Sequence, residues 1–441
     1  MRKEEQQPGR THRHKTIGLA FLAAAAVAVG MAPAASAQAA SVQAAPVHAT
    51  PVHALTARAL MARSTPASAA ARLAHSPYTL PSRAGFKSAT AGNLATSVSL
   101  SRTDVWAVGA SGATPFAEQY NGSTWTTVAM ATPKGSTQTT FAAVTAISVT
   151  DLWAVGNYEN ASGIYSTLAE HWNGTTWKVV ATPNQTGWPN NYLYSVSGDS
   201  ASDIWAVGTS LSSNNLDNST LVEHYNGKTW TEVTSPNPDA TYDEFSGVDA
   251  ISPTDVLAVG SEDDSSGFPV MLSETWNGNT WTQQPTPTPS GDDASSFANL
   301  SAISPTNIWA TGFYQSNSFA LLSLSAHWNG KKWTQVSSPN PAGNEGDLLI
   351  GMDAQSAKNI WTVGLYLTST GAGETLTEHY NGTTWSIVDS PNVNGATDNQ
   401  LTGVAAPSAN VAWAFGDTNP GGTTVTLREH WNGTKWALAQ G

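Results

Sequence analysis

The chain has 441 residues, a formal net charge of −13 at pH 7 and no cysteine. An acidic surface repels polyanions, so nucleic acids and anionic membrane surfaces are excluded as expected partners. Without cysteine the chain forms no disulfide, so its stability must come from packing.

The first 37 residues have the composition of a secretory signal peptide. Arg2, Lys3 and Arg10 precede an apolar run over residues 17–31, which is followed by Ala35, Ser36 and Ala37. A basic start, a short apolar segment and small residues at the cleavage site are typical of export signals, and the run is short for a membrane span. We therefore expect a secreted, extracellular protein without a membrane span.

Residues 38–87 are rich in Ala, Pro, Ser and Val and poor in aromatic side chains. Such a composition buries little apolar surface, so it predicts a flexible leader and not a folded core. The repeats begin at about residue 88, and the predicted folded domain is residues 88–441.

An internal repeat dominates this domain. A tryptophan inside an apolar run returns after 47 residues and then at intervals of 52, with Leu257 in its place once. Its positions are Trp106, Trp153, Trp205, Trp309, Trp361 and Trp413. An Asn-Gly pair, followed by a second tryptophan, keeps step with it, beginning at Asn121, Asn173, Asn226, Asn277, Asn329, Asn381 and Asn432. A fixed period of this length indicates a solenoid or a propeller.

Each period contains four short apolar or alternating runs of strand length, separated by turn residues. The Asn-Gly pair predicts a tight hairpin between the last two runs, because both residues tolerate positive φ. Four antiparallel strands repeated seven times predict an all-β fold, a seven-bladed β-propeller with about 52 residues in each blade. The repeated tryptophans are then expected to pack between blades.

The repeat resembles that of kelch and galactose-oxidase propellers. The resemblance rests on the apolar strand 204–208 that ends in glycine, followed by Tyr225 and Trp230. Galactose-oxidase chemistry uses a Tyr-Cys crosslink, which this chain cannot form. A sialidase would need three converging arginines, but only Arg102 and Arg428 lie in the repeat region.

A weaker resemblance links the chain to fucose-lectin propellers. Glu170, Trp172, Gly174 and Trp177 are similar to the Glu and aromatic pair that precedes a hairpin in that family. The resemblance implies sugar binding between blades, although the arginine that completes such sites is missing here.

The histidines of the repeat share one position, directly after a glutamate in most blades. Adjacent residues of a strand point to opposite faces, so His and Glu of one blade cannot meet, but those of neighbouring blades can. We expect a structural inter-blade lock of His171 with Glu223, His224 with Glu274, His327 with Glu378, His379 with Glu429, and His430 with Glu118.

The long, variable connections of a four-stranded meander all emerge on one face, where binding is expected. Trp188, the one tryptophan outside the repeat positions, stands there with Asn190 and Tyr192. This composition suits stacking on a sugar ring, so these residues are the candidate ligand-binding site. The alternative is a loop aromatic that covers the seam between two blades.

Acidic residues gather around the fourth repeat, and the meander places them on the same face. A calcium ion or a basic partner could bind there, and solvated loops are the alternative. The candidate metal ligands are Asp243, Glu244, Asp263, Asp264, Asp292 and Asp293, with Asp239 and Glu262 nearby.

These features predict a secreted, non-catalytic, monomeric propeller that binds an extracellular polysaccharide or protein through its loop-rich face. Two alternatives stay open. One is a carbohydrate-active lyase or hydrolase, for which the sequence offers no convergent acid and base, and the other is a purely structural surface protein.

Overall fold

A computed structural model describes residues 92–213, 217–238, 242–290, 294–317, 320–342 and 346–439. The predicted signal peptide and leader lie outside these residues. The described chain consists of strands, turns and one 3-10 turn, η1 (Pro420–Gly422). In this part of the chain, no helix has the length and apolar composition of a membrane-spanning segment.

The strands follow the repeat in groups of four. The first three groups are β1 (Asn93–Ser101), β2 (Asp104–Ser111), β3 (Thr114–Tyr120) and β4 (Trp125–Ala129); β5 (Ser136–Ser148), β6 (Asp151–Asn160), β7 (Tyr165–Trp172) and β8 (Trp177–Val180); and β9 (Asn190–Ser200), β10 (Asp203–Leu211), β11 (Asn218–Tyr225) and β12 (Trp230–Glu232). The fourth and fifth are β13 (Asp243–Ser252), β14 (Asp255–Asp263), β15 (Pro269–Trp276) and β16 (Trp281–Gln283); and β17 (Ala294–Ser304), β18 (Asn307–Gln315), β19 (Leu321–Trp328) and β20 (Trp333–Val336). The last two are β21 (Gly346–Ser356), β22 (Asn359–Leu367), β23 (Gly373–Tyr380) and β24 (Trp385–Ile387); and β25 (Asn399–Ser408), β26 (Val411–Thr418), β27 (Val425–Trp431) and β28 (Trp436–Leu438).

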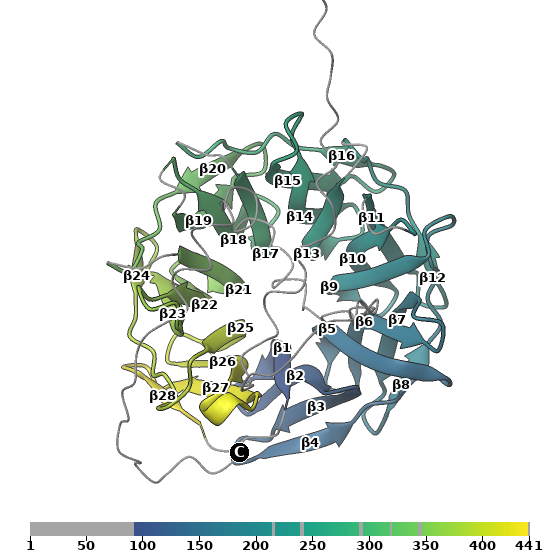
Figure 1. Ribbon diagram of the computed structural model, residues 1–441. Helices are drawn as coiled ribbons and strands as arrows, with labels where there is room; N and C mark the ends of the chain where they lie inside the picture. Colours follow the sequence, from purple (N-terminus) through teal and green to yellow (C-terminus); the bar gives the residue numbers. More distant parts are fainter. Residues whose placement is uncertain are drawn as a thin grey trace, which may run out of the picture. The chain divides into compact units, whose positions relative to one another are not determined.

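Five of these groups are separate four-stranded sheets, and β17–β24 form one eight-stranded sheet. Within the eight-stranded sheet, two antiparallel meanders are joined by a single parallel pair, Leu321 with Gly346. The first strand of each meander lies nearest a common centre and the fourth lies outermost, as in a β-propeller (Figure 1). The prediction of an all-β fold built from four-stranded antiparallel sheets is thus confirmed.

A glycine near the middle of each second strand is a steric requirement. In β10, a Cβ atom on Gly208 would lie 2.0 Å from the carbonyl oxygen of Tyr192 in the inner strand β9. The register between the two strands shifts at this point, between Val207 and Gly208. Such a bulge brings one backbone close to the other, so only glycine fits without displacement.

The repeated tryptophans pack across the seams between neighbouring sheets. Trp205 of β10 lies 5.1 Å from Trp276 and 5.6 Å from Trp281 of the next meander, measured between ring centroids. Equivalent contacts join Trp106 to Trp172 and Trp177, Trp153 to Tyr225 and Trp230, Trp309 to Tyr380 and Trp385, and Trp361 to Trp431 and Trp436. Tilted and edge-on pairs of this kind stabilise beyond the area that they bury.

The last meander packs against the first in the same way. Trp413 lies 4.8 Å from Tyr120 and 5.1 Å from Trp125. At this seam, Arg428 forms a buried ion pair with Glu118, with 3.1 Å between Nη1 and Oε2. The guanidinium also lies 5.7 Å from the ring centroid of Trp125. The sequence does not show how the ring closes. In the structure, these contacts between the last and the first meander close it.

The inner strands carry a second set of inter-sheet hydrogen bonds. A serine hydroxyl or aspartate carboxylate of one inner strand accepts the backbone N–H of an alanine in the next. The pairs are Ser197 with Ala250, Asp249 with Ala302, Ser301 with Ala354, and Asp353 with Ala406, at 2.6–3.1 Å. Polar contacts between neighbouring sheets therefore exist, but they join the inner strands and not the third strands.

The predicted lock between histidines and glutamates is wrong, because the histidines find partners within their own sheets. Each partner is the Asp or Asn two residues before the repeat tryptophan. This Asp or Asn points to the same face of the sheet as the tryptophan and lies on the second strand, next to the third strand that holds the histidine. The pairs are His171 with Asp151, His224 with Asp203, His327 with Asn307, and His379 with Asn359, at 2.6–2.9 Å. His430 has Val411 at the partner position and packs on Trp413 at 4.4 Å. The imidazole hydrogen-bonds to the Asp or Asn on the adjacent strand because this partner lies nearer than the glutamate of the neighbouring sheet.

The glutamates do reach across the seams, but toward the preceding sheet. Glu170 accepts a hydrogen bond from the backbone N–H of Ala131 (3.1 Å), and Glu429 accepts one from the hydroxyl of Ser390 (2.8 Å). Glu378 accepts one from Ser338. These carboxyls are buried, with Glu223 and Glu274 in the same position.

Burial raises the pKa of these carboxyls from an ordinary value of 4.5 to about 7 for Glu170, about 8 for Glu378 and Glu429, and about 9 for Glu274. A folded pKa above the unfolded one means that folding takes up a proton, so the free energy of unfolding falls as pH rises through this range. We expect the melting temperature to fall from pH 7 to pH 9. Calorimetry at fixed ionic strength measures it, and Glu274→Gln should flatten the slope.

The half-buried histidines do not mask this effect. Burial lowers the pKa of His327, His379 and His430 below 6.5, so their contribution rises with pH only in the acidic range. A melting temperature that rises between pH 7 and pH 9 would contradict the expectation.

Candidate functional site

Four tyrosines from three neighbouring meanders lie at the end where the long connections emerge. Tyr165 begins β7, Tyr192 and Tyr194 belong to β9, and Tyr242 directly precedes β13. The rings of Tyr165 and Tyr192 are stacked, with centroids 5.1 Å apart and planes at 29°. Tyr194 continues the series at 6.2 Å from Tyr192. We call these four residues the tyrosine row.

Hydrogen bonds of two asparagines fix the backbone beneath the tyrosine row. The side-chain oxygen of Asn190 accepts the backbone N–H of Tyr165 at 3.1 Å, which ties β9 to the adjacent meander. Asn191 accepts the N–H of Gln185 at 3.0 Å and donates to the carbonyl of Trp188 at 2.8 Å. Because Asn191 is 1% exposed, the loop that carries Trp188 is anchored to a buried side chain.

Of the three predicted ligand-binding residues, one belongs to the tyrosine row and a second supports it. Tyr192 stacks within it, and Asn190 holds it in place. Trp188 lies half-buried at its edge, and the ring contacts among the described residues do not include it. The sequence reasoning missed Tyr165, Tyr194 and Tyr242. All three stand outside the repeat positions, which is the signal that could have found them.

Carboxylates flank the tyrosine row on both sides. Glu159 of β6 is the cross-strand partner of Tyr165, and Glu244 follows Tyr242 by two residues. Burial and the negative charge of Glu159 raise the pKa of Tyr165 and Tyr192. Burial, Glu244 and the neighbouring tyrosines raise that of Tyr194. The phenols of Tyr165, Tyr192 and Tyr194 are therefore neutral at pH 7 and offer ring faces and hydroxyl groups.

The described acidic residues around the fourth repeat, which were predicted as metal ligands, have structural roles in their strands and turns. Asp243, Glu244 and Asp263 are buried at the ends of β13 and β14. Asp264 accepts the backbone N–H groups of Ser266 and Phe268, so it closes the turn between β14 and β15. Among the described residues, no group of three or more His, Asp or Glu side chains is placed to hold a metal ion. Asp239, Asp292 and Asp293 lie outside the described residues.

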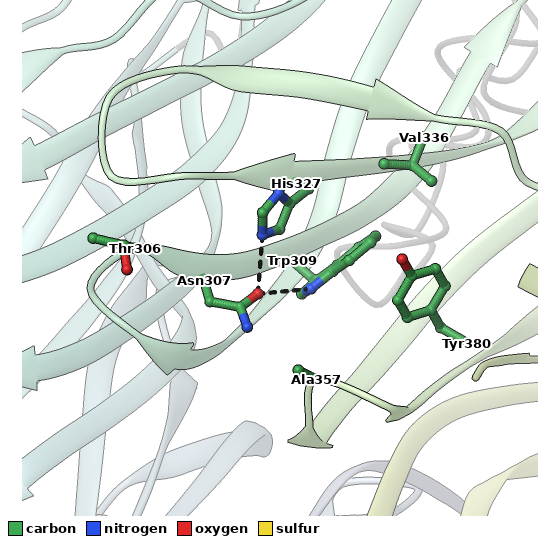
Figure 2. Close-up of a pocket in the computed structure, with 7 residues that line it drawn as sticks. All are labelled: Thr306, Asn307, Trp309, His327, Val336, Ala357 and Tyr380. Carbon is green, nitrogen blue, oxygen red and sulfur yellow. Dashed lines mark hydrogen bonds between the residues drawn. The ribbon is translucent and has the colours of Figure 1, made fainter. Parts of the chain in front are cut away.

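A pocket of about 400 Å³ lies at the opposite, tight-turn end, between β17–β20 and β21–β24 (Figure 2). Asn307 accepts a hydrogen bond from the indole of Trp309 at 3.1 Å and pairs with His327 at 2.9 Å. Tyr380 closes the far side. These are repeat residues that make the seam packing, and Tyr380 occupies a position that is tyrosine in two other seams, at Tyr120 and Tyr225, and tryptophan in the remaining four. The pocket therefore follows from the packing of this seam.

Comparison with known proteins shows the fold and leaves the family open. No family model and no curated protein matches the chain. Among solved structures, the chain is similar to a polysaccharide lyase, the PL25 ulvan lyase bound to -[GlcA(1-4)Rha3S]-, with a TM-score of 0.54 at 9% identity over 80% of this chain and 97% of that one. A fucose-specific lectin from Aleuria aurantia matches with a TM-score of 0.43 at 17% identity, over 68% of this chain and 96% of the lectin. The likeness to the lyase supports the propeller architecture, and the kelch and galactose-oxidase resemblance stays a prediction.

Proposed function

We propose that the chain is a secreted, non-catalytic, seven-bladed propeller that binds an extracellular glycan through the tyrosine row. The observation that carries this proposal is the Tyr165–Tyr192 stack, built from two meanders and held by Asn190. Tyrosine combines an apolar ring face with a polar hydroxyl, which suits the apolar faces and hydroxyl groups of a sugar.

The count of seven blades treats the eight-stranded sheet as two blades joined by one parallel pair. The aromatic seam between Trp413 and Tyr120 supports this count, because it makes the last meander the neighbour of the first. A closed wheel places all the long connections on one face, where the tyrosine row lies.

Two observations support binding over catalysis. The raised pKa values of Tyr165, Tyr192 and Tyr194 make a phenolate base costly at neutral pH. The five histidines of the described residues lie at the tight-turn ends of their third strands, away from the tyrosine row. The similarity to a polysaccharide lyase makes a lyase the enzymatic alternative, and product analysis with a bound glycan tests it.

Substitution of Tyr192 tests the site. Tyr192→Ala removes the central ring of the row and is expected to weaken glycan binding about tenfold, which corresponds to roughly 1.4 kcal/mol. Tyr192→Phe keeps the ring and should bind within about threefold of the wild type, by the same arithmetic. Isothermal titration with a glycan selected on an array measures both.

Tyr380→Phe, in the pocket at the opposite end, is the matched control and should leave binding unchanged. Unchanged binding by Tyr192→Ala would place the ligand elsewhere. Trp188→Ala reports whether the half-buried indole belongs to the site.

A further inference from the structure

The connections at the two ends of the propeller differ in charge: those at the tight-turn end are basic, and those at the loop-rich end are mostly acidic. The charged residues within the tight turns that join first to second and third to fourth strands are basic: Arg102, Lys228, Lys331, Lys332, Lys358 and Lys435. Four aspartates begin second strands at this same end: Asp104, Asp151, Asp203 and Asp255. The long connections at the other end carry, within their described residues, Asp217, Asp264, Asp389 and Asp398 against one cation, Lys134. A ligand that approaches the loop-rich face therefore meets a negative field.

The immediate surroundings of the tyrosine row follow the same division. The connections that adjoin Tyr165 and Tyr192, residues 161–164 and 181–189, contain no Lys or Arg, and the cation Lys134 lies in the connection before β5, three residues from Thr137. The strand ends beside it carry Glu159, Asp243 and Glu244. An anionic sugar bound on these rings would lose part of its hydration and lie close to carboxylates. These two connections offer it no Lys or Arg side chain with which to form an ion pair.

Glu159 is placed to meet a positive charge at the outer end of the row. It lies opposite Tyr165 in the β6–β7 register, and the hydroxyl of Thr137 lies 3.3 Å from its Oε2 and 3.2 Å from its backbone carbonyl oxygen. Its charge also acts on both Tyr165 and Tyr192. Tyrosine faces attract cations through their quadrupole, and a neighbouring carboxylate adds to this attraction.

We propose that the glycan bound by the tyrosine row carries protonated amino groups, as in a polymer of de-N-acetylated amino sugars. This inference rests on the proposed function and narrows it to one ligand class. The sugar rings stack on the tyrosines, while an ammonium group lies near the carboxylate of Glu159. Polymers rich in uronate or sulfate are excluded by the same charges.

The test compares three β-1,4-linked oligosaccharides of equal length: oligoglucosamine, its N-acetylated form and a C6-carboxylated glucan. At pH 6 and low salt, we expect oligoglucosamine to bind at least about tenfold more tightly than either, with an advantage that shrinks as salt screens the charges. Glu159→Gln should reduce this advantage about threefold or more. Glu232→Gln, on the exposed outer strand β12, is the matched control and should leave it unchanged.

The outcomes separate the two proposals. If the N-acetylated or carboxylated oligomer binds as tightly as oligoglucosamine, and Tyr192→Ala abolishes that binding, the amine inference fails and the proposed function stands. Oligolysine that competes as well as oligoglucosamine would overturn the inference by showing that charge alone is recognised. No binding of oligoglucosamine would also overturn it, and the array screen would then decide the proposed function separately.

Discussion

Arg428→Met is expected to lower the free energy of unfolding by about 3–5 kcal/mol, because it leaves the buried carboxylate of Glu118 without its cation. Arg428 and Glu118 are 3% and 2% exposed, and they join the last meander to the first. The substitution also removes the guanidinium that lies beside Trp125. Urea unfolding followed by tryptophan fluorescence measures the change.

The double variant Arg428→Met with Glu118→Gln should recover part of this loss, because it removes both charges together. Arg102→Met is the matched control: Arg102 is exposed in a tight turn, and its replacement should change stability by less than about 0.5 kcal/mol. A loss of under about 1 kcal/mol for Arg428→Met would show that the ion pair does not hold the closing seam.

Trp205→Ala is expected to cost about 3–5 kcal/mol, as for other large buried side chains reduced to alanine. Trp205 is 1% exposed and packs on Trp276 and Trp281 of the next meander. Its indole N–H also donates to Asp203 at 3.0 Å, so the substitution removes a hydrogen bond together with the packing. Calorimetry on the purified variant measures the loss.

Two comparisons separate seam packing from a general effect of losing a tryptophan. Trp205→Leu should cost less than Trp205→Ala, because Leu257 occupies the same repeat position and is fully buried against Trp328 and Trp333. Trp188→Ala should cost under about 1 kcal/mol, since Trp188 is half-buried in a loop. Equal losses for Trp188→Ala and Trp205→Ala would contradict the role given to the seams.

The repeat predicted most of the fold because each unit carries its own local signals. Turn residues such as the Asn-Gly pair at Asn226 mark the hairpins, and the period of 52 sets the order of the sheets. The ion pair at the closing seam could not be predicted, because Arg428 occurs at its repeat position once. The close contact between the backbones at Gly208 and Tyr192 could not be predicted either, because the sequence shows the glycine but not the carbonyl oxygen that faces it.

The candidate site could be predicted only in part. Loop composition pointed to Trp188, Asn190 and Tyr192, but their partner Tyr165 lies on another meander and is brought close only by folding. The histidine prediction failed because it compared residues between blades and overlooked the acceptor on the adjacent strand, as at His171 and Asp151.

The central claim is that the tyrosine row binds a glycan, and a glycan-array screen tests it most directly. The wild type, Tyr192→Ala, Tyr192→Phe and Tyr380→Phe proteins would be screened side by side after circular dichroism shows that each is folded. We predict a reproducible set of bound glycans that Tyr192→Ala loses and the other two variants keep. An empty array for the wild type, or hits that Tyr192→Ala retains in full, would contradict the claim.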